Sequence, residues 1–294
     1  MKEPIFIGSC TAMITPFNKD GIDLERFEEQ LDYQISNGTS AVVIAGTTGE
    51  IATLSDSEYE ALTVSAVEAT QQKIKVIMGV GGNNTLRCLE RALFAKSIGA
   101  DAILMTTPYY NKTSPAGLIE HFTYVADRVD IPMILYNVPG RTAISLTAEA
   151  YRKLASHPNI NGVKEASGNF SLIAEIVESC AEQLWFWSGN DDHTIPMCAL
   201  GAKGVISVAS NIVPGAIAEL CRLCLSGDYP TAIQLYRQYA PLMRALFVET
   251  NPIPVKAAMH LLGRDSGLLR RPLVPISNSH LDALTKTMKN VGLI

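Results

Sequence analysis

Short apolar runs alternate with helical patterns along the first three quarters of the chain. Most of these runs are rich in Val and Ile and almost continuously hydrophobic, as strands covered on both faces are. We therefore predict eight strands, at residues 10–14, 41–45, 75–80, 101–106, 132–136, 160–164, 184–188 and 204–208.

Helix-start signals separate the apolar runs. Asp23 can cap one helix, Ser55 and Glu58 read as a capping box, and Ser114-Pro115 can open another helix. Eight strand–helix units predict an α/β fold of the (β/α)8 TIM-barrel type. A doubly wound sheet fits the alternation too, but it usually has fewer units and an early glycine fingerprint, which this chain lacks.

The alternation stops near residue 228. Residues 229–247, 253–262 and 280–291 are predicted helices without strands between them, and residues 263–277 are a predicted loop with three Arg and two Pro. We expect a barrel over residues 1–227 that carries the active site, followed by a small C-terminal helical region over residues 228–294.

Composition narrows the class of protein. Of 294 residues, 47% are hydrophobic and 18% charged, so a sizeable core is expected. The net charge of −5, with Lys and Arg scattered singly, argues against nucleic acid as a partner. We see no signal peptide and no apolar run long enough for a membrane span. Six cysteines are too sparse for a disulfide scaffold. The expected location is the cytoplasm.

Three predicted strands deliver reactive side chains at their carboxyl ends. Lys164 ends one run, Tyr136 ends another, and Gly46-Thr-Thr-Gly-Glu50 follows a third. In parallel α/β proteins these ends converge on one face, where such enzymes carry out their chemistry. A lysine there, near a tyrosine and hydroxyl groups, predicts imine (Schiff-base) chemistry on a carbonyl substrate.

Each of these residues also has a simpler interpretation. Lys164 can be a lysine that extends its amine to water from a strand end. However, buried lysines are rare unless paired, and Glu165 is a poor partner because strand neighbours point to opposite faces. Tyr136 can be a core aromatic residue. Imine formation needs the neutral amine, a form that an apolar barrel interior favours.

Two segments can bind carboxylates. The glycines of residues 46–50 allow a sharp turn with outward-pointing amides, and such amide clusters bind anions, although an ordinary strand–helix turn fits as well. Arg141 follows Pro139-Gly140 and can be a surface arginine. Its planar guanidinium also suits the carboxylate of a second substrate.

Three other motifs are better explained by structural roles than by functional ones. Gly79-Val-Gly-Gly82 lacks the last glycine of a dinucleotide fingerprint. Cys221 and Cys224 share a helical apolar stripe with Ile217. Asp191-Asp-His193 can suggest a metal, but the remaining histidines have no ligand spacing, so we favour a helix N-terminal cap and predict no metal site.

Taken together, several motifs in order resemble the dihydrodipicolinate synthase family of pyruvate-dependent class I aldolases and lyases, over nearly the whole chain. The motifs are Gly46-Thr-Thr-Gly-Glu50, Thr107-Pro-Tyr-Tyr-Asn111, Tyr136-Asn-Val-Pro-Gly-Arg-Thr142, Gly162-Val-Lys-Glu-Ala166, Gly204-Val-Ile-Ser-Val208 and Thr250-Asn-Pro-Ile-Pro-Val-Lys256. The lysine and the Gly-Thr-Thr-Gly-Glu segment are shared by the superfamily. Arg141 is more selective, since the sialic-acid lyase branch has a different sequence there.

The resemblance implies a mechanism. Lys164 forms an imine with pyruvate, and the derived enamine attacks L-aspartate-4-semialdehyde to give 4-hydroxy-tetrahydrodipicolinate, a step in diaminopimelate and lysine biosynthesis. Tyr136 relays protons through Thr47 to Tyr110, which in the family enters from a neighbouring subunit. The protonated imine is the electron sink, so neither a metal nor an organic cofactor is expected.

The resemblance also implies binding residues and an assembly. Amides of Thr47 and Thr48 hold the pyruvate carboxylate, and Arg141 holds that of the semialdehyde. The backbones of Gly189 and Ile206 line the pocket. A homotetramer (dimer of dimers) or homodimer is expected.

Two alternatives remain. A related sugar-acid lyase or aldolase, of the N-acetylneuraminate lyase or 2-keto-3-deoxygluconate aldolase type, keeps Lys164 and Tyr136 but does not need Arg141. A non-catalytic barrel that binds keto acids tolerates the loss of Lys164 without losing its ligand.

Inhibition by lysine is expected to be weak or absent. The chain keeps Asn83 and Tyr109 of the site that inhibited family members use. It departs at Ile51 and Tyr59, where those relatives tend to have serine and histidine, and at Arg87, where they have glutamate. A cation at position 87 repels the ammonium groups of lysine. Asp56 works in the opposite direction, because it can attract an ammonium group.

Overall fold

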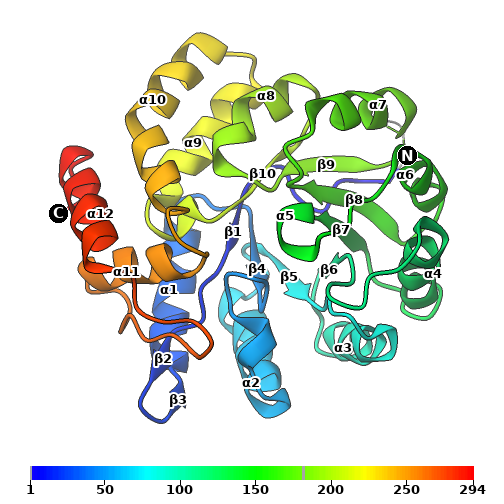
Figure 1. Cartoon of the computed structure of the whole chain (residues 1–294), viewed down its shortest axis with the longest axis horizontal. Helices are drawn as coiled ribbons and strands as arrows, with labels where there is room; N and C mark the ends of the chain where they lie inside the picture. Colours follow the sequence, from blue (N-terminus) through cyan, green and yellow to red (C-terminus); the bar gives the residue numbers. More distant parts are fainter. Residues whose placement is uncertain (1, 181–182) are drawn as a thin grey trace.

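The protein forms a closed eight-stranded parallel barrel in the computed structural model, which describes residues 2–180 and 183–294 (Figure 1). The order around the barrel is β1-β10-β9-β8-β7-β6-β5-β4. These strands span Gly8–Ala12 (β1), Ala41–Ile44 (β4), Lys75–Gly79 (β5), Ala102–Thr106 (β6), Met133–Asn137 (β7), Ile160–Glu165 (β8), Trp185–Ser188 (β9) and Gly204–Ser207 (β10). The predicted TIM barrel and its eight strands are confirmed.

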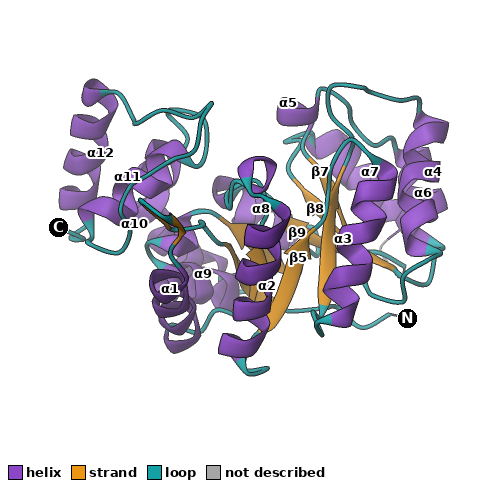
Figure 2. Ribbon diagram, turned by 90° about the horizontal axis from the view of Figure 1, so that it is seen from below, coloured by secondary structure: helices purple, strands orange, loops and turns teal. Residues whose placement is uncertain are grey.

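Helices surround the barrel, as the purple ribbons around the orange strands of Figure 2 show. They are α1 Leu24–Ser36, α2 Asp56–Thr70, α3 Thr85–Ser97, α4 Pro115–Ala126, α6 Ala148–Ala155, α7 Phe170–Cys180, α8 Thr194–Ala199 and α9 Pro214–Leu225. Short helical turns add α5 Pro139–Thr142, η1 Ile51–Thr53, η2 Asp191–His193 and η3 Ala209–Asn211.

The predicted helix caps form. The Asp23 carboxylate accepts a hydrogen bond from the amide of Arg26 at 3.1 Å. Ser55 and Glu58 form the reciprocal capping box at the start of α2. Ser114 accepts from the amide of Gly117 at 3.2 Å, with Pro115 in the first helical turn. Local polar signals therefore place these helix starts correctly.

Two apolar layers fill the molecule. The larger lies between the strands and the helix ring and includes Phe27, Leu62 and Phe122. The second fills the barrel interior, where the rings of Phe6 and Trp187 stack with centroids 4.8 Å apart. The barrel is therefore packed with side chains along its axis.

Three helices follow the barrel: α10 Tyr229–Ala245, α11 Ile253–Leu261 and α12 Asn278–Asn290. They lie at one side of the molecule in Figure 1. One apolar cluster joins Val205 of β10 and Ile217 of α9 to Met259 of α11 and Met288 of α12. The C-terminal helices thus share a core with the last barrel units, and the boundary between residues 227 and 228 stays a prediction.

Three local features differ from the expectations. A hairpin of β2 Phe17–Asn18 and β3 Gly21–Ile22 was not predicted, because two-residue strands leave no readable alternation. Arg141 lies in the one-turn helix α5, where only a turn was expected. Asp191 does not cap the helix that follows it. Its Oδ2 accepts from the amides of Val208 and Ala209, at 3.1 and 3.0 Å, and so ties the end of β9 to that of β10.

A buried polar network covers the outer side of β8. Glu165 accepts hydrogen bonds from the Tyr151 hydroxyl at 2.7 Å, the Asn137 amide group at 3.0 Å and the Ser167 backbone amide at 2.7 Å. Burial, with Glu165 alongside, raises the pKa of Tyr151 well above its ordinary value. The tyrosine is therefore a neutral donor that secures a buried carboxyl group between α6 and β8.

Tyr151→Phe removes one donor from this buried acceptor and should lower the free energy of unfolding by about 1–3 kcal/mol. Chemical denaturation measures the change. Tyr239→Phe is the matched control, because the Tyr239 hydroxyl has no hydrogen-bond partner among the described residues. Equal losses in both variants would show that the Glu165 network contributes nothing specific.

Candidate active site

Lys164 and Tyr136 lie side by side at the carboxyl ends of two neighbouring strands. The register of β7 and β8 pairs Tyr136 with Lys164. The lysine Nζ lies 4.4 Å from the centroid of the tyrosine ring. Lys164 is 5% exposed and Tyr136 8%. The structure therefore brings together the two residues on which the imine prediction depends.

The interior of the barrel surrounds the lysine side chain with few polar partners. No carboxylate oxygen of the described residues lies within salt-bridge distance of Lys164 Nζ. Burial raises the pKa of the Cys10 thiol and that of Asp191, and the charge of Lys164 opposes both shifts. Lys164 therefore lies near both groups, and its Nζ forms no ion pair among the described residues.

Gly189, directly after β9, makes room for the lysine. A Cβ atom there would lie 2.7 Å from Ala166 Cβ and 3.2 Å from Lys164 Cγ. The Gly189 amide donates to the carbonyl of Glu165 at 2.8 Å, which holds the two strand ends together. Ile206, on β10, belongs to the same interior cluster as Tyr136. Both predicted pocket residues therefore border the barrel interior.

The segment 46–50 forms a tight turn after β4. The amides of Glu50 and Ile51 donate back to the carbonyls of Thr47 and Gly46, at 3.1 and 3.4 Å. Among the described residues, the amides of Thr47 and Thr48 have no acceptor. Two neighbouring free N–H groups at a turn form an anion-binding arrangement. We call residues 46–50 the carboxylate turn.

A cavity of about 290 Å³ opens beside this turn. Its lining includes Thr47, Tyr109, Val138, Arg141, Thr250 and Asn251. The Arg141 guanidinium donates to the carbonyl of Asn251 at 3.2 Å and is otherwise exposed. A cation at the edge of this cavity can hold the carboxylate of a second substrate.

Tyr110 lies apart from the other predicted catalytic residues. Its side chain is 92% exposed, and its backbone has φ 68°, in the left-handed region. Within one chain, the Tyr110 hydroxyl makes no hydrogen bond with Tyr136 or Thr47. Its assignment to the site of a neighbouring subunit stays a prediction.

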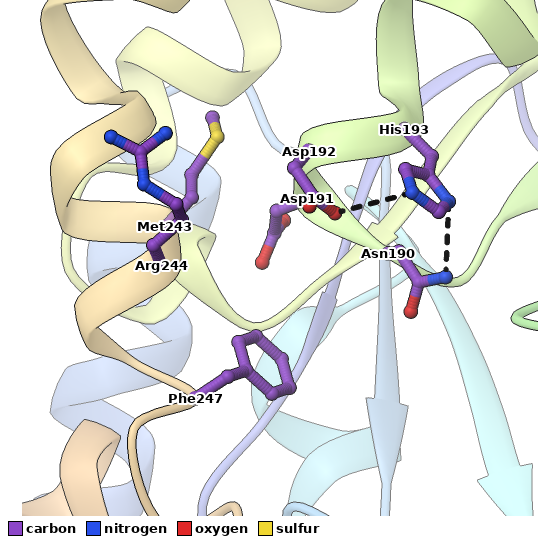
Figure 3. A pocket seen from close by; sticks show the side chains of 7 residues that line it. All are labelled: Asn190, Asp191, Asp192, His193, Met243, Arg244 and Phe247. Carbon is purple, nitrogen blue, oxygen red and sulfur yellow. Dashed lines mark hydrogen bonds and ion pairs between the residues drawn. The ribbon is translucent and has the colours of Figure 1, made fainter. Parts of the chain in front are cut away.

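A second cavity, of about 350 Å³, lies between η2 and α10 (Figure 3). It is lined by Asn190, Asp191, Asp192, His193, Met243, Arg244 and Phe247. Neither Lys164 nor Tyr136 reaches its wall. The cavity beside the carboxylate turn does not include these two residues either, but it contains Thr47 and Arg141, which the second cavity lacks.

Sequence reasoning missed three residues around the site. Cys10 and Asp191 lie close enough to Lys164 to share its electrostatic field, and Asn251 donates to the Thr48 hydroxyl at 2.9 Å. Asn251 carried a signal, since it belongs to the motif at residues 250–256, and Asp191 was singled out only as a helix cap or metal ligand. Among the described residues, no group of acidic, cysteine and histidine side chains is arranged to hold a metal ion, and no helix could cross a membrane.

Comparison with known proteins gives consistent results over nearly the whole chain. The chain is 45% identical over 292 residues to the 4-hydroxy-tetrahydrodipicolinate synthase of Thermoanaerobacter sp. (strain X514), which covers 99% of this chain and 98% of the relative. The crystal structure of dihydrodipicolinate synthase from Aquifex aeolicus matches with a TM-score of 0.96 at 41% identity, over 98% of this chain and 99% of that one.

A third similar protein is the chloride inhibited dihydrodipicolinate synthase from Acinetobacter baumannii, solved as a complex with pyruvate. It matches with a TM-score of 0.96 at 38% identity, over 98% of this chain and 99% of that chain. The model of the dihydrodipicolinate synthetase family matches residues 5–291. The barrel and the buried lysine at its rim agree with the family match and with the 45% identity over 292 residues. The chain belongs to the dihydrodipicolinate synthetase family.

Proposed function

We propose that this protein is a lyase that condenses pyruvate with L-aspartate-4-semialdehyde to give 4-hydroxy-tetrahydrodipicolinate, for diaminopimelate and lysine biosynthesis. The observation that carries the proposal is the buried Lys164 amine, unpaired among the described residues and 4.4 Å from the Tyr136 ring. Full-length relatives named 4-hydroxy-tetrahydrodipicolinate synthase, at 41–45% identity, support the substrate assignment.

The reaction begins at Lys164. Its amine adds to the keto carbon of pyruvate and water leaves, which forms the imine. Loss of a methyl proton gives the enamine, and its carbon attacks the aldehyde of the second substrate. The amino group of that substrate then adds to the imine carbon, closes the ring and releases Lys164. The protonated imine accepts the electrons of the C–H bond, so the proposed steps need neither a metal nor an organic cofactor.

The binding roles follow the geometry of the rim. The free amides of Thr47 and Thr48 hold the pyruvate carboxylate, and Arg141 at the edge of the cavity holds the carboxylate of the semialdehyde. The backbones of Gly189 and Ile206 border the pocket. Strands β7 and β8 place Tyr136 beside Lys164, where its hydroxyl can move protons during imine formation.

Tyr110 completes the relay from Tyr136 through Thr47, and it comes from a neighbouring subunit in this proposal. The exposure of this tyrosine on an outward loop supports such a role, because a large aromatic side chain left in water gains by burial in an interface. In this proposal a homodimer is the smallest assembly with complete sites. A homotetramer built from two such dimers has complete sites as well.

The sugar-acid lyase or aldolase considered from the sequence is not favoured. Relatives at 41–45% identity over the full chain carry the synthase name. In addition, Arg141 lies at the cavity edge, where a second carboxylate needs a cation.

The site implied for lysine inhibition is altered. A cavity of about 190 Å³ is lined by Ile51, Asn83, Arg87, Arg91 and Tyr109, among others. Arg87 pairs with Asp56 and with Glu90, so the Asp56 carboxylate already has a cation partner. Tyr59 is buried, donates to the carbonyl of Gly79 at 3.1 Å and is not among the residues that line the cavity. These ion pairs weaken the attraction expected from Asp56, and they also offset part of the charge of Arg87.

Incubation with pyruvate and borohydride should add a pyruvate-derived mass to the peptide that contains Lys164, because reduction fixes the imine. Lys164→Ala should abolish the label, and Lys203→Ala, which removes a lysine outside the barrel interior, should leave it unchanged. Peptide mass spectrometry locates the label. A label on Lys203 or Lys256, or on no lysine, would refute the proposed function.

Arg141→Ala should impair use of the semialdehyde more than imine formation. The lost bidentate pair is worth about 1.5–3 kcal/mol, roughly a 10- to 150-fold loss of kcat/KM for the semialdehyde. Arg141→Lys keeps the charge but loses the planar guanidinium group. Its kcat/KM for the semialdehyde should therefore lie between those of the unaltered enzyme and of Arg141→Ala. Steady-state kinetics and borohydride trapping separate the steps, and an equal loss in both would indicate a structural role instead.

Lysine should inhibit weakly or not at all. Initial rates at subsaturating pyruvate across a lysine titration provide the measurement. Arg87→Glu replaces the repelling cation with an attracting carboxylate and should lower the half-inhibiting concentration. Half-inhibition of the unaltered enzyme at submillimolar lysine would contradict the prediction.

A further inference from the structure

A fully buried ion pair connects the C-terminal helices to the carboxylate turn. Lys256 of α11 donates from Nζ to Glu50 Oε1 at 3.0 Å, and the two side chains are 0% and 2% exposed. The same Nζ donates to the carbonyl of Thr15 at 2.9 Å and lies 4.1 Å from the centroid of the Phe17 ring. The partner residues are separated by 206 positions in the sequence.

Other contacts secure the remaining residues of the same turn. The Asn251 side chain donates to the Thr48 hydroxyl at 2.9 Å, and the Thr15 hydroxyl donates to the Gly49 carbonyl at 2.7 Å. The amide of Arg270 donates to Glu50 Oε2 at 3.0 Å. Thr48, Gly49 and Glu50 are therefore each held from outside the turn, chiefly by the segment 250–256 and its neighbours.

A buried ion pair of this kind contributes little net stability to the fold. Two charges removed from water lose their hydration, and buried pairs can often be replaced by apolar residues without loss of stability. Burial lowers the pKa of Lys256, and Glu50 opposes that shift. Glu50 also has φ 55°, in the left-handed region that is uncommon for residues other than glycine. Its carboxylate is held at both oxygens, by Lys256 and by the amide of Arg270.

The constrained backbone is the part that presents the free amides. Glu50 donates from its amide to the Thr47 carbonyl, so its conformation determines where the Thr47–Thr48 peptide lies. A carboxylate bound by two amides is sensitive to small displacements of either donor, because hydrogen bonds weaken steeply with misalignment.

We propose that Lys256 and Glu50 are positioning residues that hold the amides of Thr47 and Thr48 in the geometry that binds the substrate carboxylate. The inference rests on the proposed function and deepens it, because it assigns the C-terminal segment 250–256 a role in affinity for pyruvate. Lys256 is not part of the wall of the cavity beside the turn, and Glu50, which is, keeps its carboxylate on Lys256 and on the amide of Arg270. Their effect reaches the substrate through the backbone of the carboxylate turn.

The test measures borohydride trapping as a function of pyruvate concentration. It compares the unaltered enzyme with Lys256→Met, Glu50→Gln/Lys256→Met and Asn251→Ala. The single Lys256 variant leaves a buried carboxylate unpaired and can fail to fold, whereas the double variant removes both charges and nearly keeps the shape. Asn251→Ala breaks the contact with Thr48 and leaves no buried charge.

Both Lys256 variants should need at least ~10-fold more pyruvate for half-maximal trapping, about the effect of one lost charge-assisted hydrogen bond. Asn251→Ala should also raise the pyruvate concentration for half-maximal trapping, but by a smaller factor. In the Lys256 variants the maximal amount trapped should change by less than ~2-fold, because Lys164 is untouched. The double variant should regain part of the melting temperature that the single variant loses, because only the buried Asp265 then lacks the nearby cation, but it should not regain the affinity.

His280→Gln is the matched control. It breaks the His280–Glu249 contact of 2.7 Å in the same C-terminal region, without reaching the turn, and should leave half-maximal trapping unchanged. The inference would be overturned if the folded double variant needed no more pyruvate for half-maximal trapping than the unaltered enzyme. It would also be overturned if His280→Gln raised that concentration as much as the double variant does. Failure of the unaltered enzyme to trap pyruvate would refute the proposed function instead.

Discussion

Closure of the parallel barrel is the constraint on which the rest of the structure depends. It brings all eight strand ends to one rim, and it sends alternate residues of each strand inward and outward. On β8 this alternation places Lys164 in the interior and Glu165 in the helix layer, where Tyr151 and Asn137 satisfy it. Two adjacent charged residues therefore have separate environments, and the amine stays free for carbonyl chemistry.

A rim built from loops needs external support, and here the C-terminal helices supply part of it. Their apolar cluster is continuous with β10 and α9, so they form one body with the end of the barrel. From that body Lys256 and Asn251 reach the carboxylate turn. In the proposal made above, binding affinity at the rim therefore depends on residues of the C-terminal region.

Local patterns predicted much of this structure, and long-range contacts account for what they missed. The strands and the caps at Asp23 and Ser55 follow from runs of a few residues, each with its own periodicity or hydrogen-bonding signal. The β2–β3 hairpin is too short for such a signal. The Asp191 contacts with Val208 and Ala209, and that of Lys256 with Glu50, join residues distant in sequence, so no local pattern contains them. The proposed role of Tyr110 involves a second chain, which one sequence cannot place.

The central claim is that Lys164 carries the substrate while the carboxylate turn binds it. A crystal structure of the enzyme after treatment with pyruvate and borohydride tests both halves at once. The account predicts continuous density from Lys164 Nζ to the former keto carbon of pyruvate, with the carboxylate oxygens on the amides of Thr47 and Thr48. Pyruvate bound without a covalent link to Lys164, or with its carboxylate on Arg141 instead of the turn, would contradict it.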